Sequence, residues 1–151
     1  MMSPKSMLRN PEVISPVEEF TKGGFREIMD DENADSKSVK KLLLCSGKVY
    51  FDLLHEQKRA KRTDVAIIRI EQLFPFPVKQ LADIRKKYAK ADKILWVQEE
   101  PENMGAWTYI LRKYRDHVDD GICRPPSASP ATGYAKIHQQ EQQDIVNRAF
   151  A

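Results

Sequence analysis

Three short polar segments carry residue types that could bind or transform a ligand. Ser46-Gly47-Lys48 offers backbone N–H groups and a lysine, a combination that suits an anion. Glu71-Gln72 offers a carboxylate and an amide, and Glu99-Glu100 places two carboxylates side by side in the sequence. Neighbouring carboxylates can act as general acid and base when one raises the pKa of the other. The chemistry within reach is therefore anion binding or proton transfer.

Each segment also has a simpler structural interpretation. Ser46 is suited to the N-cap of a helix, with Gly47 allowing a tight turn. Side chains one residue apart on an extended backbone point in opposite directions, so Glu99 and Glu100 are not expected to form an acid–base pair. Asn103 is predicted to cap the helix that follows it. A purely structural role is favoured for all three segments.

Several kinds of catalytic or metal site are excluded by spacing. The sequence has no Walker-type phosphate loop, no G-x-G-x-x-G and no G-x-S-x-G. His55, His117 and His138 do not have the spacing of zinc ligands, so no metal site is expected. Cys45 and Cys123 are predicted to be buried free thiols. On residue chemistry alone, the chain is a binding or interaction domain without a complete active site.

The composition is that of one globular domain. The chain has 151 residues, of which 41% are hydrophobic and 31% charged. No apolar run approaches the ~20 residues that a membrane-spanning helix needs. The net charge of +3 is too small to indicate nucleic acid, and the basic cluster at residues 58–62 has no interleaved aromatic residues. Neither a membrane nor a nucleic-acid partner is expected.

Short apolar runs alternate with helical stretches from residue 41 onward. The runs at 42–45, 65–70 and 94–97, with a weaker one at 121–124, are typical of strands buried on both faces of a parallel sheet. Helical apolar stripes follow them, and the last helix is predicted over 134–150. The pattern predicts an α/β fold, a three-layer sandwich whose mostly parallel sheet carries helices on both faces. The strand order and the direction of the last strand remain open.

The stretch before this pattern has a different composition. Residues 12–35 contain eight acidic and two basic residues, Pro16 and the Gly23-Gly24 pair, and Pro11 lies just before them. The stretch has no sustained helical or strand period. One short helical turn is expected near 17–20. We therefore divide the chain into an N-terminal arm or linker, residues 1–39, and an α/β domain, residues 40–151.

The chain also contains a series of short motifs whose order along the sequence is typical of one family. Taken together, the sequence closely resembles the carboxyl-terminal region of 2-oxoglutarate dehydrogenase decarboxylating subunits, and residues 13–38 match least. The motifs that carry the resemblance are Pro4-Lys5-Ser6-Met7-Leu8-Arg9, Ser46-Gly47-Lys48-Val49-Tyr50, Ile68-Arg69-Ile70-Glu71-Gln72-Leu73, Trp96-Val97-Gln98-Glu99-Glu100-Pro101, Gly105-Ala106-Trp107, Ser127-Ala128-Ser129-Pro130-Ala131 and His138-Gln139.

The resemblance implies an enzyme of the transketolase-like class that uses thiamine diphosphate and Mg²⁺. Such subunits are homodimers that decarboxylate 2-oxoglutarate and pass a succinyl group to a lipoyl-bearing succinyltransferase component. Their cofactor motif opens with Gly-Asp-Gly and closes with Asn-Asn, and neither string occurs here. The chain is therefore expected to be one domain of a longer enzyme, with no catalytic or cofactor-binding residue of its own and no activity by itself.

The resemblance further implies a regulatory site for acetyl-coenzyme A. The positions that match it are Arg9, Gln72 and the pair Lys79-Gln80, where the family pattern has two basic residues. One cation of that pattern is therefore absent. The alternative is that these residues only pack the arm against the domain.

Two other functions remain open at this stage. The same architecture occurs in 2-oxoadipate dehydrogenases, whose substrate specificity lies outside this region. A free-standing nucleotide-binding regulatory module, using Arg9 and Ser46-Gly47-Lys48, is the alternative from a different class. The expected location is the cytoplasm of a bacterium, or the mitochondrial matrix if the source is eukaryotic.

Overall fold

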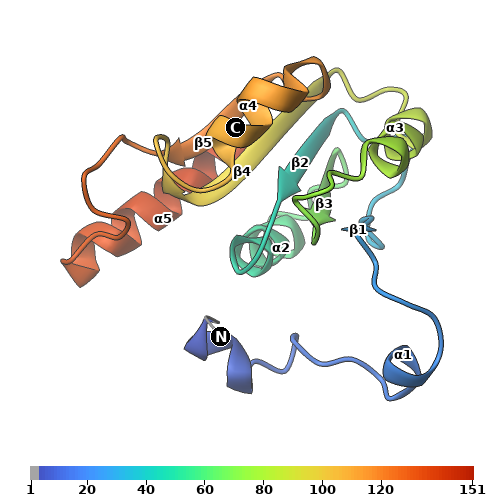
Figure 1. Ribbon diagram of the computed structural model, residues 1–151, viewed down its shortest axis with the longest axis horizontal. Coiled ribbons are helices and arrows are strands. Elements are labelled where there is room, and N and C mark those ends of the chain that lie inside the picture. The colour runs from blue at the N-terminus through green and yellow to red at the C-terminus, as the bar shows by residue number, and fades with distance from the viewer. Residues whose placement is uncertain (1–3) are drawn as a thin grey trace.

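A five-stranded sheet forms the centre of the chain in a computed structural model, which describes residues 4–151 (Figure 1). The strand order is β1-β3-β2-β4-β5. Four strands are parallel, namely β2 (Lys41–Cys45), β3 (Val65–Ile70), β4 (Lys93–Pro101) and β5 (Asp120–Arg124). The edge strand β1 (Ile28–Met29) runs antiparallel to β3. The open question about the last strand is thus resolved, because β5 is parallel.

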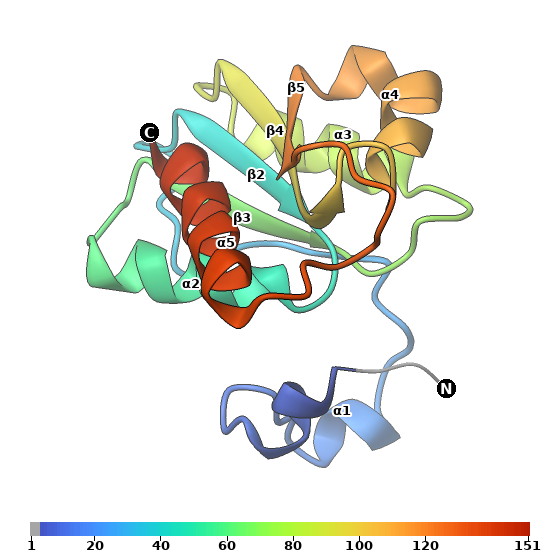
Figure 2. The ribbon, with the colours of Figure 1, turned by 90° about the vertical axis from the view of Figure 1, so that its left-hand side faces the viewer.

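Two pairs of helices cover the two faces of the sheet (Figure 2). Helices α2 (Val49–Arg59) and α5 (Ala135–Phe150) pack on one face, against Leu43 and Cys45 of β2. Helices α3 (Val78–Lys87) and α4 (Trp107–Tyr114) pack on the other face, against Leu42 and Leu44. Successive side chains of a strand point to opposite faces, so both faces of β2 are apolar. The predicted three-layer α/β sandwich is confirmed.

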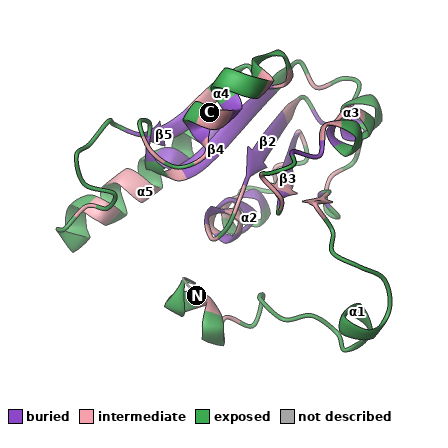
Figure 3. Ribbon diagram, viewed as in Figure 1, coloured by how far each residue is buried: buried purple, intermediate pink, exposed green. Residues whose placement is uncertain are grey.

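Strands β2 to β4 are almost entirely buried, whereas residues 4–26 are mostly exposed (Figure 3). This first part contains a 3-10 helix at Lys5–Arg9 and helix α1 (Glu18–Thr21), which confirms the predicted helical turn. A second 3-10 helix, Arg115–His117, follows α4. Strand β1 was not predicted, because its two residues are only half-buried and carry no apolar run. Cys45 and Cys123 are buried free thiols, as expected.

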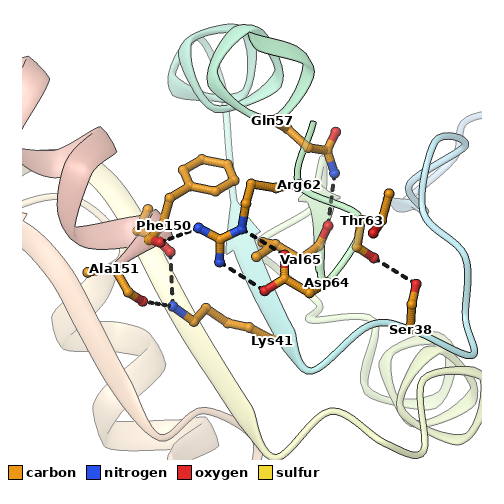
Figure 4. Close-up of polar contacts among 10 residues, drawn as sticks. Ser38, Lys41, Gln57, Arg62, Thr63, Asp64, Val65, Phe150 and Ala151 are labelled. Atoms are coloured by element: carbon orange, nitrogen blue, oxygen red, sulfur yellow. Dashed lines mark hydrogen bonds and ion pairs between the residues drawn. The ribbon is translucent and has the colours of Figure 1, made fainter. Parts of the chain in front are cut away.

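Basic side chains fix the end of α5 at the amino-terminal edge of the sheet (Figure 4). Lys41 Nζ donates to the backbone oxygens of Ala149 at 3.3 Å and Ala151 at 2.6 Å. Arg62 donates to the Phe150 oxygen and pairs with Asp64 at 2.7 Å. The last carbonyls of a helix lack partners within the helix, and these cations supply them. The opposite, carboxyl-terminal edge carries the polar segments singled out above.

None of the helices within residues 4–151 combines the length and apolar character needed to cross a bilayer.

Candidate functional site

The sheet has a topological switch point between its neighbouring strands β2 and β4. The chain leaves β2 toward α2 on one face and leaves β4 toward α4 on the other face. Diverging connections of this kind leave a crevice at the carboxyl ends of the strands, where α/β proteins bind ligands. A cavity of about 530 Å³ lies here, lined among others by Ser46, Gly47, Phe74, Gln98, Glu100 and Tyr109.

Gln98 organises the loop that closes one side of this cavity. Its side chain is 3% exposed, and its Oε1 accepts hydrogen bonds from Trp96 Nε1 at 3.0 Å and the Trp107 backbone N–H at 2.9 Å. Its Nε2 donates to the backbone oxygens of Pro101 at 3.1 Å and Met104 at 2.8 Å. A buried carboxamide with all these partners holds the loop in one conformation. Gln98 is therefore a structural residue of the site.

Two capping predictions are wrong. Helix α4 begins after Ala106, and the Asn103 side chain instead bonds both the backbone N–H and the backbone oxygen of Ser127, each at 3.0 Å. Gln98 Oε1 accepts instead from the Trp107 backbone N–H, one of the N–H groups at the start of α4 that have no partner within the helix. Helix α2 begins after Lys48 without a side-chain cap, so Ser46 does not have that role. Gly47, at φ = 75°, does provide the expected tight turn.

The two carboxylates of β4 have different surroundings, as predicted. Glu99 pairs with Lys48 Nζ at 2.6 Å, and Lys48 also pairs with Asp52 at 3.2 Å. Burial of Lys48 favours its neutral form, but Glu99 and Asp52 outweigh burial and raise the pKa of the lysine above its usual value. Glu100 lines the cavity instead. Two carboxylates therefore already neutralise the Lys48 charge, which makes Lys48 less suited to bind an anionic ligand.

A buried arginine that the sequence did not single out joins the end of β5 to α5. Arg124 is 5% exposed and donates to Glu141 at 3.0 Å, to His138 Nδ1 at 3.1 Å and to Gln142 at 2.9 Å. Gln142 donates in turn to Asp52 at 2.9 Å, which links the network to α2. The half-buried His138 is a packing residue, as its helical stripe predicted. The sequence signal that could have indicated this network is the spacing of His138, Glu141 and Gln142, which places all three on one face of α5.

The residues matched to the regulatory site lie in two places. The Gln80 side chain donates to the Glu27 carboxylate at 2.9 Å, and the Gln72 backbone N–H donates to the Glu27 backbone oxygen at 3.1 Å. Arg9 lies in the exposed 3-10 helix of the arm, and Lys79 is exposed at the beginning of α3. Within residues 4–151 no hydrogen bond or ion pair joins Arg9 or Lys79 to the two glutamines.

The cavity does not fit thiamine diphosphate and its metal ion. Among the described residues, its lining carries the carboxylate of Glu100 and no basic side chain, whereas a diphosphate requires cations or a bound metal. In the part of the chain that the structure describes, no three His, Cys, Asp or Glu residues are grouped as a metal site requires. This cavity therefore lacks the groups that the cofactor would need.

Comparisons with known proteins agree on one family. Residues 14–150 match the family model described as 2-oxoglutarate dehydrogenase C-terminal. The chain is 42% identical, over its whole length, to the 2-oxoglutarate dehydrogenase E1 component of Cupriavidus necator, of which it covers 16%. It is 39% identical over 99% of its length to the E1 component of Haemophilus influenzae, covering 17% of that protein. A Mycobacterium relative, a multifunctional 2-oxoglutarate metabolism enzyme, is 39% identical over the whole chain, which covers 13% of it.

The fold has a counterpart among solved structures. A split-gene transketolase, described as an inactive tetramer of four beta subunits, superposes with a TM-score of 0.56 at 14% sequence identity. The match covers 92% of this chain and 46% of the transketolase chain. At that identity the likeness concerns the fold alone, and it confirms the transketolase-like α/β architecture. The chain spans about a sixth of the length of its curated relatives. With 137 consecutive positions matched by one family model, this chain belongs to the 2-oxoglutarate dehydrogenase C-terminal family.

Proposed function

We propose that the chain serves as the carboxyl-terminal domain of a thiamine-diphosphate-dependent 2-oxoglutarate dehydrogenase. The observation that carries the proposal is the match over residues 14–150, together with relatives that are named for 2-oxoglutarate. Those names favour 2-oxoglutarate over 2-oxoadipate as the substrate of the parent enzyme. They also favour a domain of a longer protein over a free-standing nucleotide-binding module.

Within that enzyme, the domain acts as a scaffold. Its polar groups at the carboxyl edge are used to hold loops together: Gln98 fixes the loop before α4, and Lys48 ties β4 to α2. Thiamine diphosphate and Mg²⁺ are then held by other parts of the parent subunit, as the family resemblance implies. The homodimer, the lipoyl-bearing succinyltransferase partner and a cytoplasmic location belong to the same proposal.

The N-terminal arm, residues 1–39, contacts the rest of the parent protein in this proposal, while residues 40–151 form the α/β domain. Large apolar side chains of the arm are 70–80% exposed here, namely those of Leu8, Ile14, Val17, Phe20 and Phe25. So many exposed apolar groups in one segment are typical of a surface that packs against another domain.

The scaffold proposal is tested by an activity assay on the isolated chain. Supplied with thiamine diphosphate, Mg²⁺ and 2-oxoglutarate, the chain is expected to release no CO₂ above the rate without protein. Turnover that depends on the chain and on the cofactor would contradict the proposal.

The regulatory part of the proposal assigns acetyl-coenzyme A to Arg9, Gln72, Lys79 and Gln80. Its support is that Glu27 brings Gln72 and Gln80 together beside the beginning of α3. Calorimetric titration of the intact parent subunit is expected to give saturable binding that Arg9→Ala weakens and the control Lys5→Ala does not. Equal binding by both variants would remove Arg9 from the site.

A further inference from the structure

The cavity at the switch point has an apolar lining with one acidic group, whereas a phosphate-bearing cofactor requires basic groups. Apolar groups of Leu73, Phe74, Ala106 and Tyr109 form much of it. Among residues 4–151, Glu100 supplies its one charged side chain. A volume of about 530 Å³ is within the range of small-molecule sites. Nothing assigned to the domain so far uses this space.

Phe74 lines the cavity and leaves its ring accessible to a ligand. Its side chain is 81% exposed, although the neighbouring Phe76 in the same loop is buried in the core. On the α4 side, the Tyr109 ring is held edge-on to Tyr114 at 5.6 Å between centroids, and their hydroxyls are 3.2 Å apart. Of the aromatic rings that line the cavity, that of Tyr109 is therefore fixed, and that of Phe74 is open to a ligand.

Glu100 differs from its neighbour Glu99 in having no basic side chain paired with it among the described residues. Within residues 4–151, Glu99 pairs with Lys48, whereas no ion pair or side-chain hydrogen bond is formed by the Glu100 carboxylate. The carboxylate is thus free to bind a ligand. Ser46 and Gly47 complete the lining beside the beginning of α2, where backbone amides suit a neutral or accepting group rather than a second cation.

We propose that this cavity binds an organic cation with a single guanidinium or ammonium head on an apolar stem. The head lies against the Glu100 carboxylate and the aromatic rings of Phe74 and Tyr109, and the stem contacts Leu73 and Ala106. Aromatic ring faces attract cations, and a carboxylate adds charge-assisted hydrogen bonds. The proposal concerns a site separate from the reaction of the parent enzyme, and it stands whether or not that activity is found.

Calorimetric titration of the 151-residue chain with butylguanidinium tests the site. Butylurea is the matched neutral ligand, because it has the same shape and apolar stem without the charge. Glu100→Gln removes the carboxylate charge, and Glu102→Gln is the control, since Glu102 is an exposed acid two residues away that does not line the cavity. Both substitutions are at exposed positions, and thermal melting checks that each variant keeps the fold.

The expected result is saturable binding of butylguanidinium that Glu100→Gln weakens about tenfold, as loss of a charge-assisted hydrogen bond predicts. Phe74→Ala weakens it as well, and Glu102→Gln leaves it unchanged. Equal binding of butylurea, an equal effect of the two glutamate substitutions, or no saturation below about 10 mM would overturn the proposal.

A second arm identifies the source of the cation. A short arginine-containing peptide that binds more tightly than butylguanidinium would assign the head group to a side chain of a partner protein. Tighter binding of the free cation would assign a small molecule. Because acetyl-coenzyme A is anionic, its failure to compete with butylguanidinium is expected, and competition would contradict a cation-selective site.

Discussion

The Asp31 carboxylate accepts a hydrogen bond of 2.7 Å from the Gln57 side chain, with both residues buried. The same carboxylate oxygen accepts from the Ile67 backbone N–H of β3 at 2.9 Å. Strand β1 ends at Met29, so the edge of β3 beyond it has lost its strand partner. Asp31 takes the place of that partner, and it thereby attaches the end of the N-terminal segment to the sheet and to α2.

Replacing Asp31 by alanine is therefore expected to lower the free energy of unfolding by about 1–3 kcal/mol, because it leaves the Ile67 N–H without an acceptor and the Gln57 amide with only the Val65 oxygen. Urea denaturation measures the change. Glu32→Ala is the matched control, since Glu32 is the exposed neighbour. Equal stability of the two variants would show that Asp31 does not anchor the segment.

Gln98→Leu is expected to destabilise the loop before α4, by about 2 kcal/mol or more, since the Trp107 N–H and two backbone oxygens lose their buried partner. Hydrogen exchange of the Trp107 amide reports the loop directly and is expected to accelerate. The exposed Gln140 offers a control substitution. Unchanged protection of Trp107 would contradict the role given to Gln98.

Gly121 lies against the ring of Trp107, and a Cβ at this position would come within 2.5 Å of the ring. Gly121→Ala is therefore expected to cost about 1–3 kcal/mol through overpacking. Gly133→Ala is the control, because a Cβ there meets nothing within 4 Å. Thermal denaturation compares the two variants. A larger loss for Gly133→Ala would argue against the packing described for α4 and β5.

The Arg62–Asp64 pair makes a pH-dependent contribution to stability. The hydrogen bonds from Arg62 lower the pKa of Asp64 below its usual value. A carboxyl group with a lowered pKa in the folded state stabilises the protein above its unfolded pKa, and this stabilisation is lost as the pH falls through the folded pKa. The wild-type protein is thus expected to have a higher melting temperature than Asp64→Asn at pH 7, and the difference is expected to shrink as the pH falls below about 4.

A difference between the two proteins that grows toward acid pH would have the wrong sign and would contradict this account. Asp83→Asn is the control, since the Asp83–Lys86 pair is highly exposed. Exposed pairs of this kind contribute little to stability at any pH.

The sequence was sufficient to predict the three layers of the fold but not the edge strand of the sheet, β1. Runs such as Leu42-Leu43-Leu44-Cys45 are apolar at every position, which only a strand covered on both faces requires. Ile28 and Met29 form a strand because β3 presents an unpaired edge, and nothing in their own pattern indicates it. Asp31 lies in the acidic stretch that was assigned to the arm or linker, and it is buried for the same reason.

The polar contacts at the carboxyl edge were predicted less well, because their partners are distant in sequence or belong to the backbone. The divergence of Glu99 and Glu100 follows from strand geometry and was predicted correctly. The buried position of Arg124 depends on α5, and the role of Gln98 depends on backbone oxygens whose directions no sequence pattern encodes. Asn103 lies near a helix start, yet the loop carries it to Ser127 instead.

The most direct test of the central claim is a domain replacement in the Cupriavidus necator relative, whose matching segment is 42% identical to this chain. The chimera, carrying this chain in place of that segment, is assayed for decarboxylation of 2-oxoglutarate, with 2-oxoadipate as the comparison substrate and a Gly121→Val chimera as the misfolded control. The account predicts 2-oxoglutarate turnover within about tenfold of the natural enzyme. A folded chimera that binds thiamine diphosphate but does not decarboxylate 2-oxoglutarate would contradict it.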